Sequence, residues 1–182
     1  MNISDLKSTL SKRGGVAVQN RFKVDILPPA SLKLGADGAR DLTILCESCT
    51  MPGRQISTVD YQLLQHSFKI PSGFTLDDVT LTFVLTNDFF PKKLFEAWAA
   101  STIDFNLYKA KYLEDYRGTI VIHQLAKGYW TDEDEPNIVQ SVKLIDAFPI
   151  QLSAINLDNT AENSVQKFSV VIAYKNFELI NI

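Results

Sequence analysis

The sequence predicts a mainly β protein: an antiparallel β-sandwich or barrel with one short flanking α-helix and an N-terminal amphipathic arm. Apolar and polar residues alternate with period two in several short segments, and turn residues separate these segments. The predicted strands follow one another directly, which favours antiparallel sheets. The length of 182 residues suits one domain with an arm. We place the arm at residues 1–20 and a single β domain at 21–182.

The arm is predicted to contain a short helix over residues 2–13. Ile3, Leu6 and Leu10 recur at helical spacing, and the Gly14–Gly15 pair marks the end of the helix. Three large apolar residues make a marginal helix that needs a surface to dock on. Two interpretations stay open, a frayed terminus or an arm that packs on a neighbouring subunit.

Seven or eight strands are predicted along the rest of the chain. The segment Val79–Thr86 gives the clearest signal, because its threonine-rich positions alternate with apolar ones and leave one face for water or a partner. Small residues and two glycines predict a loop over Ala30–Asp41, and Pro71–Gly73 is predicted to be a turn. The predicted strands and extended segments are Arg21–Ile26, Leu42–Cys46, Val59–Ile70, Val79–Thr86, Thr119–Gln124, Val139–Ala147, Ile150–Ile155 and Val165–Tyr174.

One internal helix is predicted over Pro91–Ala100, with a proline at its start. Phe90, Leu94 and Trp98 recur every four residues, and Phe95 flanks this stripe. These four residues are predicted to anchor the helix to the core, where it lies flat on the sheets. Residues 101–117 are predicted to be irregular, and their interleaved tyrosines and cations favour an interface or packing role over nucleic-acid stacking.

Composition excludes several classes of protein. Lys and Arg total 18 and Asp and Glu total 21, giving a formal net charge of −3, whereas dedicated nucleic-acid binders usually show a basic excess. No apolar run approaches the roughly 18 residues of a membrane span. The N-terminus is too polar for a signal peptide, and two cysteines make no disulfide framework. We therefore expect a soluble protein made in a reducing cytoplasm.

No catalytic or metal-binding motif stands out. Cys46 and Cys49 form a CxxC that ends a predicted strand and has no second ligand pair, so we expect two structural thiols. The acidic run Asp132–Glu135 is expected to be a solvated loop. We expect no enzyme, cofactor or metal. An enzyme remains an alternative, and its mark would be a pocket that joins His123 or His66 to a carboxylate.

The order of the elements resembles the tail-tube proteins of contractile-tailed bacteriophages, which are related in fold to the type VI secretion tube protein. The resemblance covers about residues 3–178. Its elements are, in order, ISDLKSTL, RFKVDI, LTILCESCTMPG, FKIPSGF, DDVTLTFVLTNDF, FFPKKLFEAWAAS, YKAKYLEDYRGTIVIHQLAK and KFSVVIAYKNFEL. Single motifs are not diagnostic, and their order and spacing carry the resemblance.

The resemblance implies a structural protein whose hexameric rings stack into the inner tube of a contractile tail, the conduit for genome ejection. Strands of six subunits would form one inner barrel, while the arm and the long extended segment reach the neighbouring ring. The residues implied at the inter-ring interface are Ile3, Leu6, Leu10, Gln55, Val59 and Tyr61. Two alternatives stay open, a baseplate-proximal ring that initiates the tube and a type VI secretion tube protein.

The implied partners are further copies of the chain, the tail sheath protein, the tape measure protein, the baseplate hub or tube initiator, and the tail terminator. DNA would pass without specific binding, and no membrane insertion is implied. The implied location is the virion tail, assembled in the host cytoplasm. Since a conduit for DNA should not bind phosphates, we expect no net basic stripe along the lumen. Which strand lines the lumen stays open.

Overall fold

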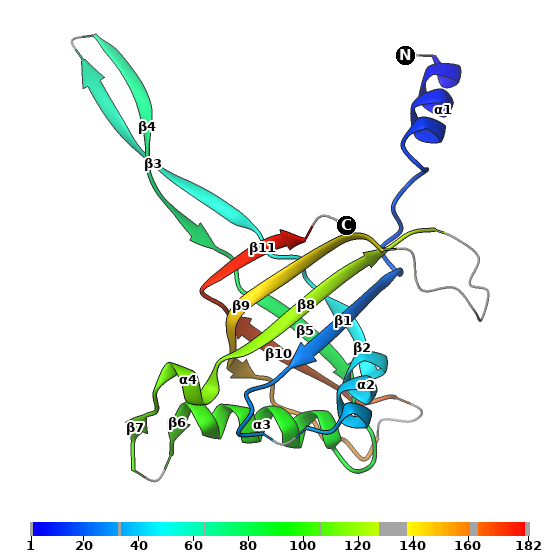
Figure 1. Cartoon of the computed structure of the whole chain (residues 1–182), viewed down its shortest axis with the longest axis vertical. Helices are drawn as coiled ribbons and strands as arrows, with labels where there is room; N and C mark the ends of the chain where they lie inside the picture. The colour runs from blue at the N-terminus through cyan, green and yellow to red at the C-terminus, as the bar shows by residue number, and fades with distance from the viewer. Residues whose placement is uncertain are drawn as a thin grey trace.

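Strands are the predominant secondary structure of the chain (Figure 1). The computed structural model describes residues 2–32, 34–63, 65–105, 107–127, 138–160 and 164–180. Within these residues the helices are α1 (Ile3–Lys12), α2 (Ala36–Leu45), α3 (Phe90–Thr102) and α4 (Leu113–Tyr116). The strands are β1 (Phe22–Leu27), β2 (Cys46–Cys49), β3 (Arg54–Leu63), β4 (His66–Leu76), β5 (Val79–Val84), β6 (Ile103–Asp104), β7 (Lys109–Ala110), β8 (Gly118–Leu125), β9 (Ile138–Leu152), β10 (Lys167–Ala173) and β11 (Asn176–Ile180).

The main strands wrap around one core in the order β1-β8-β9-β10-β5-β2, and β11 pairs with β9. All of these pairs are antiparallel, which confirms the predicted fold class. The first part of β9 pairs with β8 and β11, and its last residues pair with β10. We call β1, β8, β9 and β11 sheet A, and β9, β10, β5 and β2 sheet B. The long strand β9 therefore belongs to both sheets.

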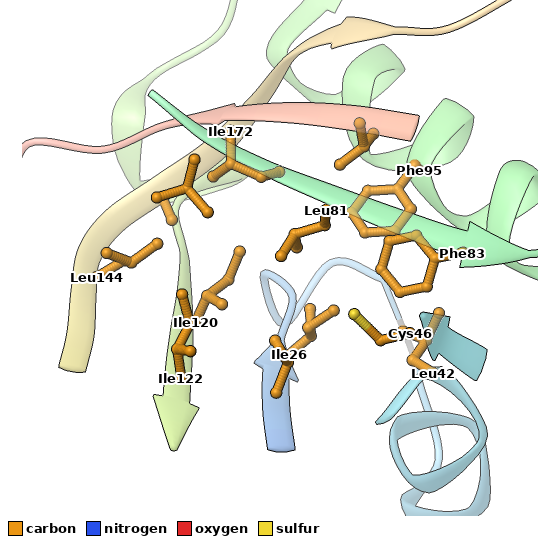
Figure 2. Packing of buried hydrophobic residues seen from close by; sticks show 14 of the residues in the cluster. Ile26, Leu42, Cys46, Leu81, Phe83, Phe95, Ile120, Ile122, Leu144 and Ile172 are labelled. Atoms are coloured by element: carbon orange, nitrogen blue, oxygen red, sulfur yellow. The ribbon is translucent and has the colours of Figure 1, made fainter. Parts of the chain in front are cut away.

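Helix α2 closes the seam between β1 and β2, which do not pair with each other. Thr43 Oγ1 donates a hydrogen bond to the carbonyl oxygen of Val24 at 2.9 Å. Leu42 is fully buried and lies with Cys46 near Ile26 and Phe83 (Figure 2). The loop predicted over Ala30–Asp41 is therefore wrong from Ala36 onwards, and the strand predicted over Leu42–Cys46 is wrong up to Leu45, since β2 begins at Cys46. In a strand Leu42 and Ile44 would share a face, but Leu42 is buried and Ile44 is 67% exposed.

Helix α3 covers one end of the barrel (Figure 1). It places two aromatic side chains in the core. Phe95 and Trp98 are fully buried and stack with ring centroids 5.9 Å apart. Phe95 also contacts the rings of Phe83 and Phe168. Trp98 Nε1 donates to the carbonyl oxygen of Tyr116 at 2.8 Å, so its one polar atom is satisfied. The other two residues of the predicted stripe, Phe90 and Leu94, are partly buried against the same core.

Three further differences concern the strands and the irregular segment. The two strands predicted on either side of Pro149 are one strand, because Pro149 lies where the register with β10 shifts and a missing N–H is tolerated. The strand predicted over Val165–Tyr174 is β10, and it is followed by a further strand, β11, that was not predicted. Residues 101–117, predicted to be irregular, contain the short strands β6 and β7 and helix α4. The predicted acidic loop Asp132–Glu135 lies outside the described residues.

Candidate assembly surfaces

Strands β3 and β4 form a two-stranded ribbon that projects from the barrel (Figure 1). Their pairing runs from Arg54 opposite Leu76 to Leu63 opposite His66. The predicted turn at Pro71–Gly73 is wrong, because both residues lie within β4. Pro71 pairs with Thr58, next to a register shift at which β4 has the extra residue Ser72, and such an irregularity accommodates a residue without an N–H.

The outer half of the ribbon has one apolar face and one polar face. Cross-strand register places two apolar pairs on one face, Val59–Ile70 and Tyr61–Phe68. These four side chains are 43% to 57% exposed. The opposite face carries the polar pairs Asp60–Lys69 and Gln62–Ser67. The exposed pair Ile56–Phe74 lies on this second face nearer the barrel, because Ile56 and Val59 are three residues apart in β3. Because an isolated two-stranded ribbon is marginally stable in water, an exposed apolar face of this size marks a surface for a partner.

The N-terminal helix α1 also projects from the barrel, at the same end of the molecule as the ribbon (Figure 1). It buries none of its residues, and Ile3 and Leu6 are 71% and 48% exposed. Gly14 and Gly15 adopt positive φ angles and end the helix, and the Gly15 N–H donates to the Leu10 carbonyl oxygen at 2.8 Å. The helix predicted over residues 2–13 is therefore present, and its apolar stripe is free for a partner.

The hairpin of β6 and β7 projects at the opposite end of the molecule, beside α3 (Figure 1). We call this hairpin and the residues next to it the apolar spur. Phe105, Leu107, Tyr108 and Tyr112 are 63% to 88% exposed around β6 and β7. Tyr108 holds a positive φ of 52°, a conformation uncommon for a bulky residue. The two ends of the molecule thus present different exposed apolar surfaces.

A polar ladder crosses sheet A at His123. His123 Nδ1 lies 2.6 Å from Ser141 Oγ, and His123 Nε2 lies 3.2 Å from an Asp25 carboxylate oxygen. These groups match the types in a hydrolytic triad. However, Ser141 is only 1% exposed, so its hydroxyl is closed to a substrate. The ladder instead links β1, β8 and β9. His66, the other histidine named by the sequence analysis, lies at the start of β4.

The two cysteines lie at the two ends of β2, with Cys46 buried and Cys49 half-buried. Burial, together with the neighbouring Cys49 thiol, raises the pKa of Cys46 to about 12, and burial raises the pKa of Cys49 to about 11. Both thiols are therefore protonated at neutral pH, the unreactive state. Within the described ranges, no three His, Cys, Asp or Glu side chains gather where they could hold a metal ion. In the same residues, no helix has the length and apolar character to cross a membrane.

The sequence model of a family described as phage tail tube protein matches residues 17–180 of the chain. The chain belongs to the phage tail tube family. A tail tube protein of Serratia phage KSP90 is 22% identical over 173 residues, which cover 94% of this chain and 93% of the relative. The resemblance seen in the order of elements is confirmed, and so is the prediction of a tail tube protein.

Solved structures of contractile injection systems share the fold of this tail tube protein. A chain of the PVC sheath–tube complex in the extended state has a TM-score of 0.62 at 16% identity, covering 100% of this chain and 99% of that chain. A chain of the anti-feeding prophage tube-terminating cap also has a TM-score of 0.62, at 17% identity, with 92% of both chains covered. A chain of the anti-feeding prophage baseplate has a TM-score of 0.59 at 14% identity, with 91% and 95% covered.

The predicted interface residues of the ribbon in this tail tube protein lie on one side of β3. Gln55, Val59 and Tyr61 are separated by even numbers of residues along the strand, so their side chains lie on the same side. Val59 and Tyr61 belong to the apolar face of the ribbon. Sequence reasoning did not name their cross-strand partners, Ile70 and Phe68, because it did not predict the pairing of β3 with β4.

Proposed function

We propose that this tail tube protein forms hexameric rings that stack into the inner tube of a contractile phage tail and conduct the genome during ejection. The observation that carries the proposal is the ribbon of β3 and β4, whose apolar face has no partner within the described subunit. Residues Val59 and Tyr61 would contact the next ring through this face, with Gln55 on the same side of β3 nearer the barrel.

The position of the projections supports stacking with one polarity. Both α1 and the ribbon project from one end of the subunit, while the apolar spur lies at the other end. A contact between unlike surfaces is heterologous and repeats along an open filament instead of closing a dimer. In this arrangement Ile3, Leu6 and Leu10 dock the arm on the neighbouring ring, and residues 1–20 act as an arm on the domain at 21–182.

The proposed partners follow from the complexes in which the related folds occur. Those structures are described as a sheath–tube complex, a baseplate and a tube-terminating cap. By analogy, this chain would contact a tail sheath protein, a baseplate hub or initiator, and a tail terminator, with a tape measure protein and then DNA inside the tube. The protein would be assembled in the host cytoplasm and reside in the virion tail, with a structural and non-enzymatic role.

Negative-stain electron microscopy of the purified chain tests the proposal. We expect rings or tubes with a central hole. Replacing Leu6 and Leu10 with Asp should prevent stacking and leave a folded subunit, because two carboxylates cannot enter an apolar contact. The matched control is Ser4→Asp with Ser8→Asp, which adds the same charge to the other side of α1 and should still assemble.

Two results would contradict parts of the proposal. A chain that stays monomeric at high concentration, even with preformed baseplates as initiators, would exclude a self-assembling tube. Unimpaired tubes from the Leu6→Asp, Leu10→Asp variant would exclude the role of the arm alone. Copy number per virion separates a repeating tube subunit from an initiating ring.

A further inference from the structure

The outer faces of the two sheets differ in chemistry. In β5 and β10 the residues facing the core are buried, and the alternate residues are half-buried on the outside. We call the outer side of sheet B the hydroxyl face, defined by Ser48, Thr80, Thr82 and Ser169. Ser48 lies opposite Thr82 in the register of β2 and β5, and Ser169 lies opposite Thr82 in β10. The four hydroxyls therefore occupy neighbouring positions on three adjacent strands.

Polar groups on and beside the hydroxyl face bond to one another. Thr82 Oγ1 and Ser169 Oγ are 3.1 Å apart, and the Ser169 N–H donates to Ser153 Oγ at 2.9 Å. The Thr80 N–H donates to Thr50 Oγ1 at 2.8 Å. One of the two hydroxyl protons of Thr82 and Ser169 is therefore donated within the subunit and is not offered to a phosphate acceptor.

The hydroxyl face is also nearly free of charge. Lys167 is the one cation in the described strands of sheet B on this side, and its Nζ lies 2.5 Å from Glu47 Oε1. The outer face of sheet A instead carries Lys23, Asp25 and His123 in the polar ladder. Lys143 and Glu178 add two opposed charges there, in β9 and β11. A polyanion is attracted mainly by cations that neutralise its phosphates, so it should bind the outer face of sheet B more weakly than that of sheet A.

Sheet B is also the sheet that the ribbon prolongs. Strand β2 leads into β3, and β4 leads into β5, so the ribbon extends the sheet B side of the barrel. Strands β3 and β4 have 10 and 11 residues. At roughly 3.3 Å per residue, the ribbon is therefore about 33 Å long. A sealed conduit needs an inner wall that continues from one ring to the next. A sheet that carries its own axial extension supplies that continuity.

We infer that the hydroxyl face of sheet B lines the lumen of the tube, where it lets duplex DNA slide past without binding its phosphates. The inference rests on the proposed function as a tube and identifies sheet B as its inner wall. The outer face of sheet A then points away from the lumen.

Cysteine labelling of assembled tubes tests the inference. The test variant is Thr82→Cys, and the matched control is Thr119→Cys, a half-buried threonine on the outer face of central strand β8. Each tube sample is treated with a small maleimide dye and, separately, with maleimide beads wider than the whole tube. The unsubstituted protein gives the background from Cys46 and Cys49.

The dye should label both variants, because small molecules diffuse into the tube from its ends. Beads should couple to Thr119→Cys tubes at least about tenfold more than to Thr82→Cys tubes. Three results would overturn the inference: equal bead coupling to both variants, bead coupling to Thr82→Cys tubes but not to Thr119→Cys tubes, or failure of the dye to label Thr82→Cys. If Thr82→Cys does not assemble, Ser169→Cys presents a thiol on the same face. Absence of tubes from unsubstituted protein would instead overturn the proposed function, and with it this assignment.

Discussion

At the scale of single residues, the contact between Trp98 and Gly118 fixes how α3 meets the barrel. The indole ring lies over Gly118, and the Leu27 carbonyl oxygen borders the same position. Because Trp98 also bonds to Tyr116 and stacks on Phe95, it has no room to move aside. The absence of a side chain at Gly118 is therefore a requirement of packing.

Replacing Gly118 with Ala should destabilise the subunit. A Cβ at this position would meet the Trp98 ring and lie 2.8 Å from the Leu27 carbonyl oxygen. Overpacking of this kind costs about 1–3 kcal/mol, which urea unfolding followed by circular dichroism would measure. Gly73→Ala is the matched control, since nothing lies within 4 Å of its added Cβ. Equal midpoints for the two variants would contradict this account of α3 packing.

Stability should fall at alkaline pH because of the buried thiols. The pKa of Cys46 rises from the usual 9.0 to about 12 on folding, so the folded state keeps a proton that the unfolded state has lost. This contribution is complete below pH 9 and is lost as pH rises from 9 towards 12, by about 2–3 kcal/mol at pH 11. Urea midpoints at pH 8 and pH 11 measure it. Cys46→Ala should show a smaller decrease, and an identical decrease would contradict the assignment.

At the scale of elements, the ribbon shows how a segment can be ordered by its own pairing and still need a partner. Tyr61 and Phe68 contact each other across the strands with centroids 5.4 Å apart, yet both remain about half exposed. Cross-strand pairing specifies the register, and burial against another subunit would supply most of the stabilisation.

Opposite faces of the ribbon should respond differently to charge. Replacing Tyr61 and Phe68 with Glu should abolish stacking, because it places two carboxylates on the apolar face. Gln62→Glu with Ser67→Glu is the control, since it creates the same cross-strand repulsion on the polar face. Sedimentation velocity measures assembly, and circular dichroism checks folding of both variants. Loss of assembly in both would show that repulsion within the ribbon, and not its apolar face, decides the outcome.

Elements whose apolar residues recur with a clear period were predictable from sequence. Elements whose structure depends on contacts with other segments were not. The alternation of Val79, Leu81 and Phe83 identified β5, and the four-residue stripe through Trp98 identified α3. Helix α2 was missed because only Leu42 is buried in it, which leaves no periodic stripe to detect. The apolar face of the ribbon was half predicted, because Val59 and Tyr61 were named but their partners Ile70 and Phe68 depend on the pairing of β3 with β4, which the sequence analysis did not predict.

At the scale of the whole molecule, folding and assembly should be thermodynamically linked. A partner that binds only the folded subunit raises its apparent stability, by about 2.7 kcal/mol when its concentration is 100 times the dissociation constant. For a chain of 182 residues this corresponds to a midpoint about 5–10 °C higher. Differential scanning calorimetry across protein concentrations should show the shift for the unsubstituted chain. The Tyr61→Glu, Phe68→Glu variant should keep a concentration-independent midpoint, and a rising one would contradict the linkage.

The passage of β9 through both sheets has a mechanical consequence. Its backbone is hydrogen-bonded to β8 and β11 in sheet A and to β10 in sheet B, so one covalent chain joins the two sheets. A force that pushes one sheet along its strands is transmitted to the other through main-chain bonds, which deform less than side-chain contacts between separate sheets. We therefore expect the subunit to resist shear as one rigid body, so that a load on one sheet reaches the other without the two sliding apart.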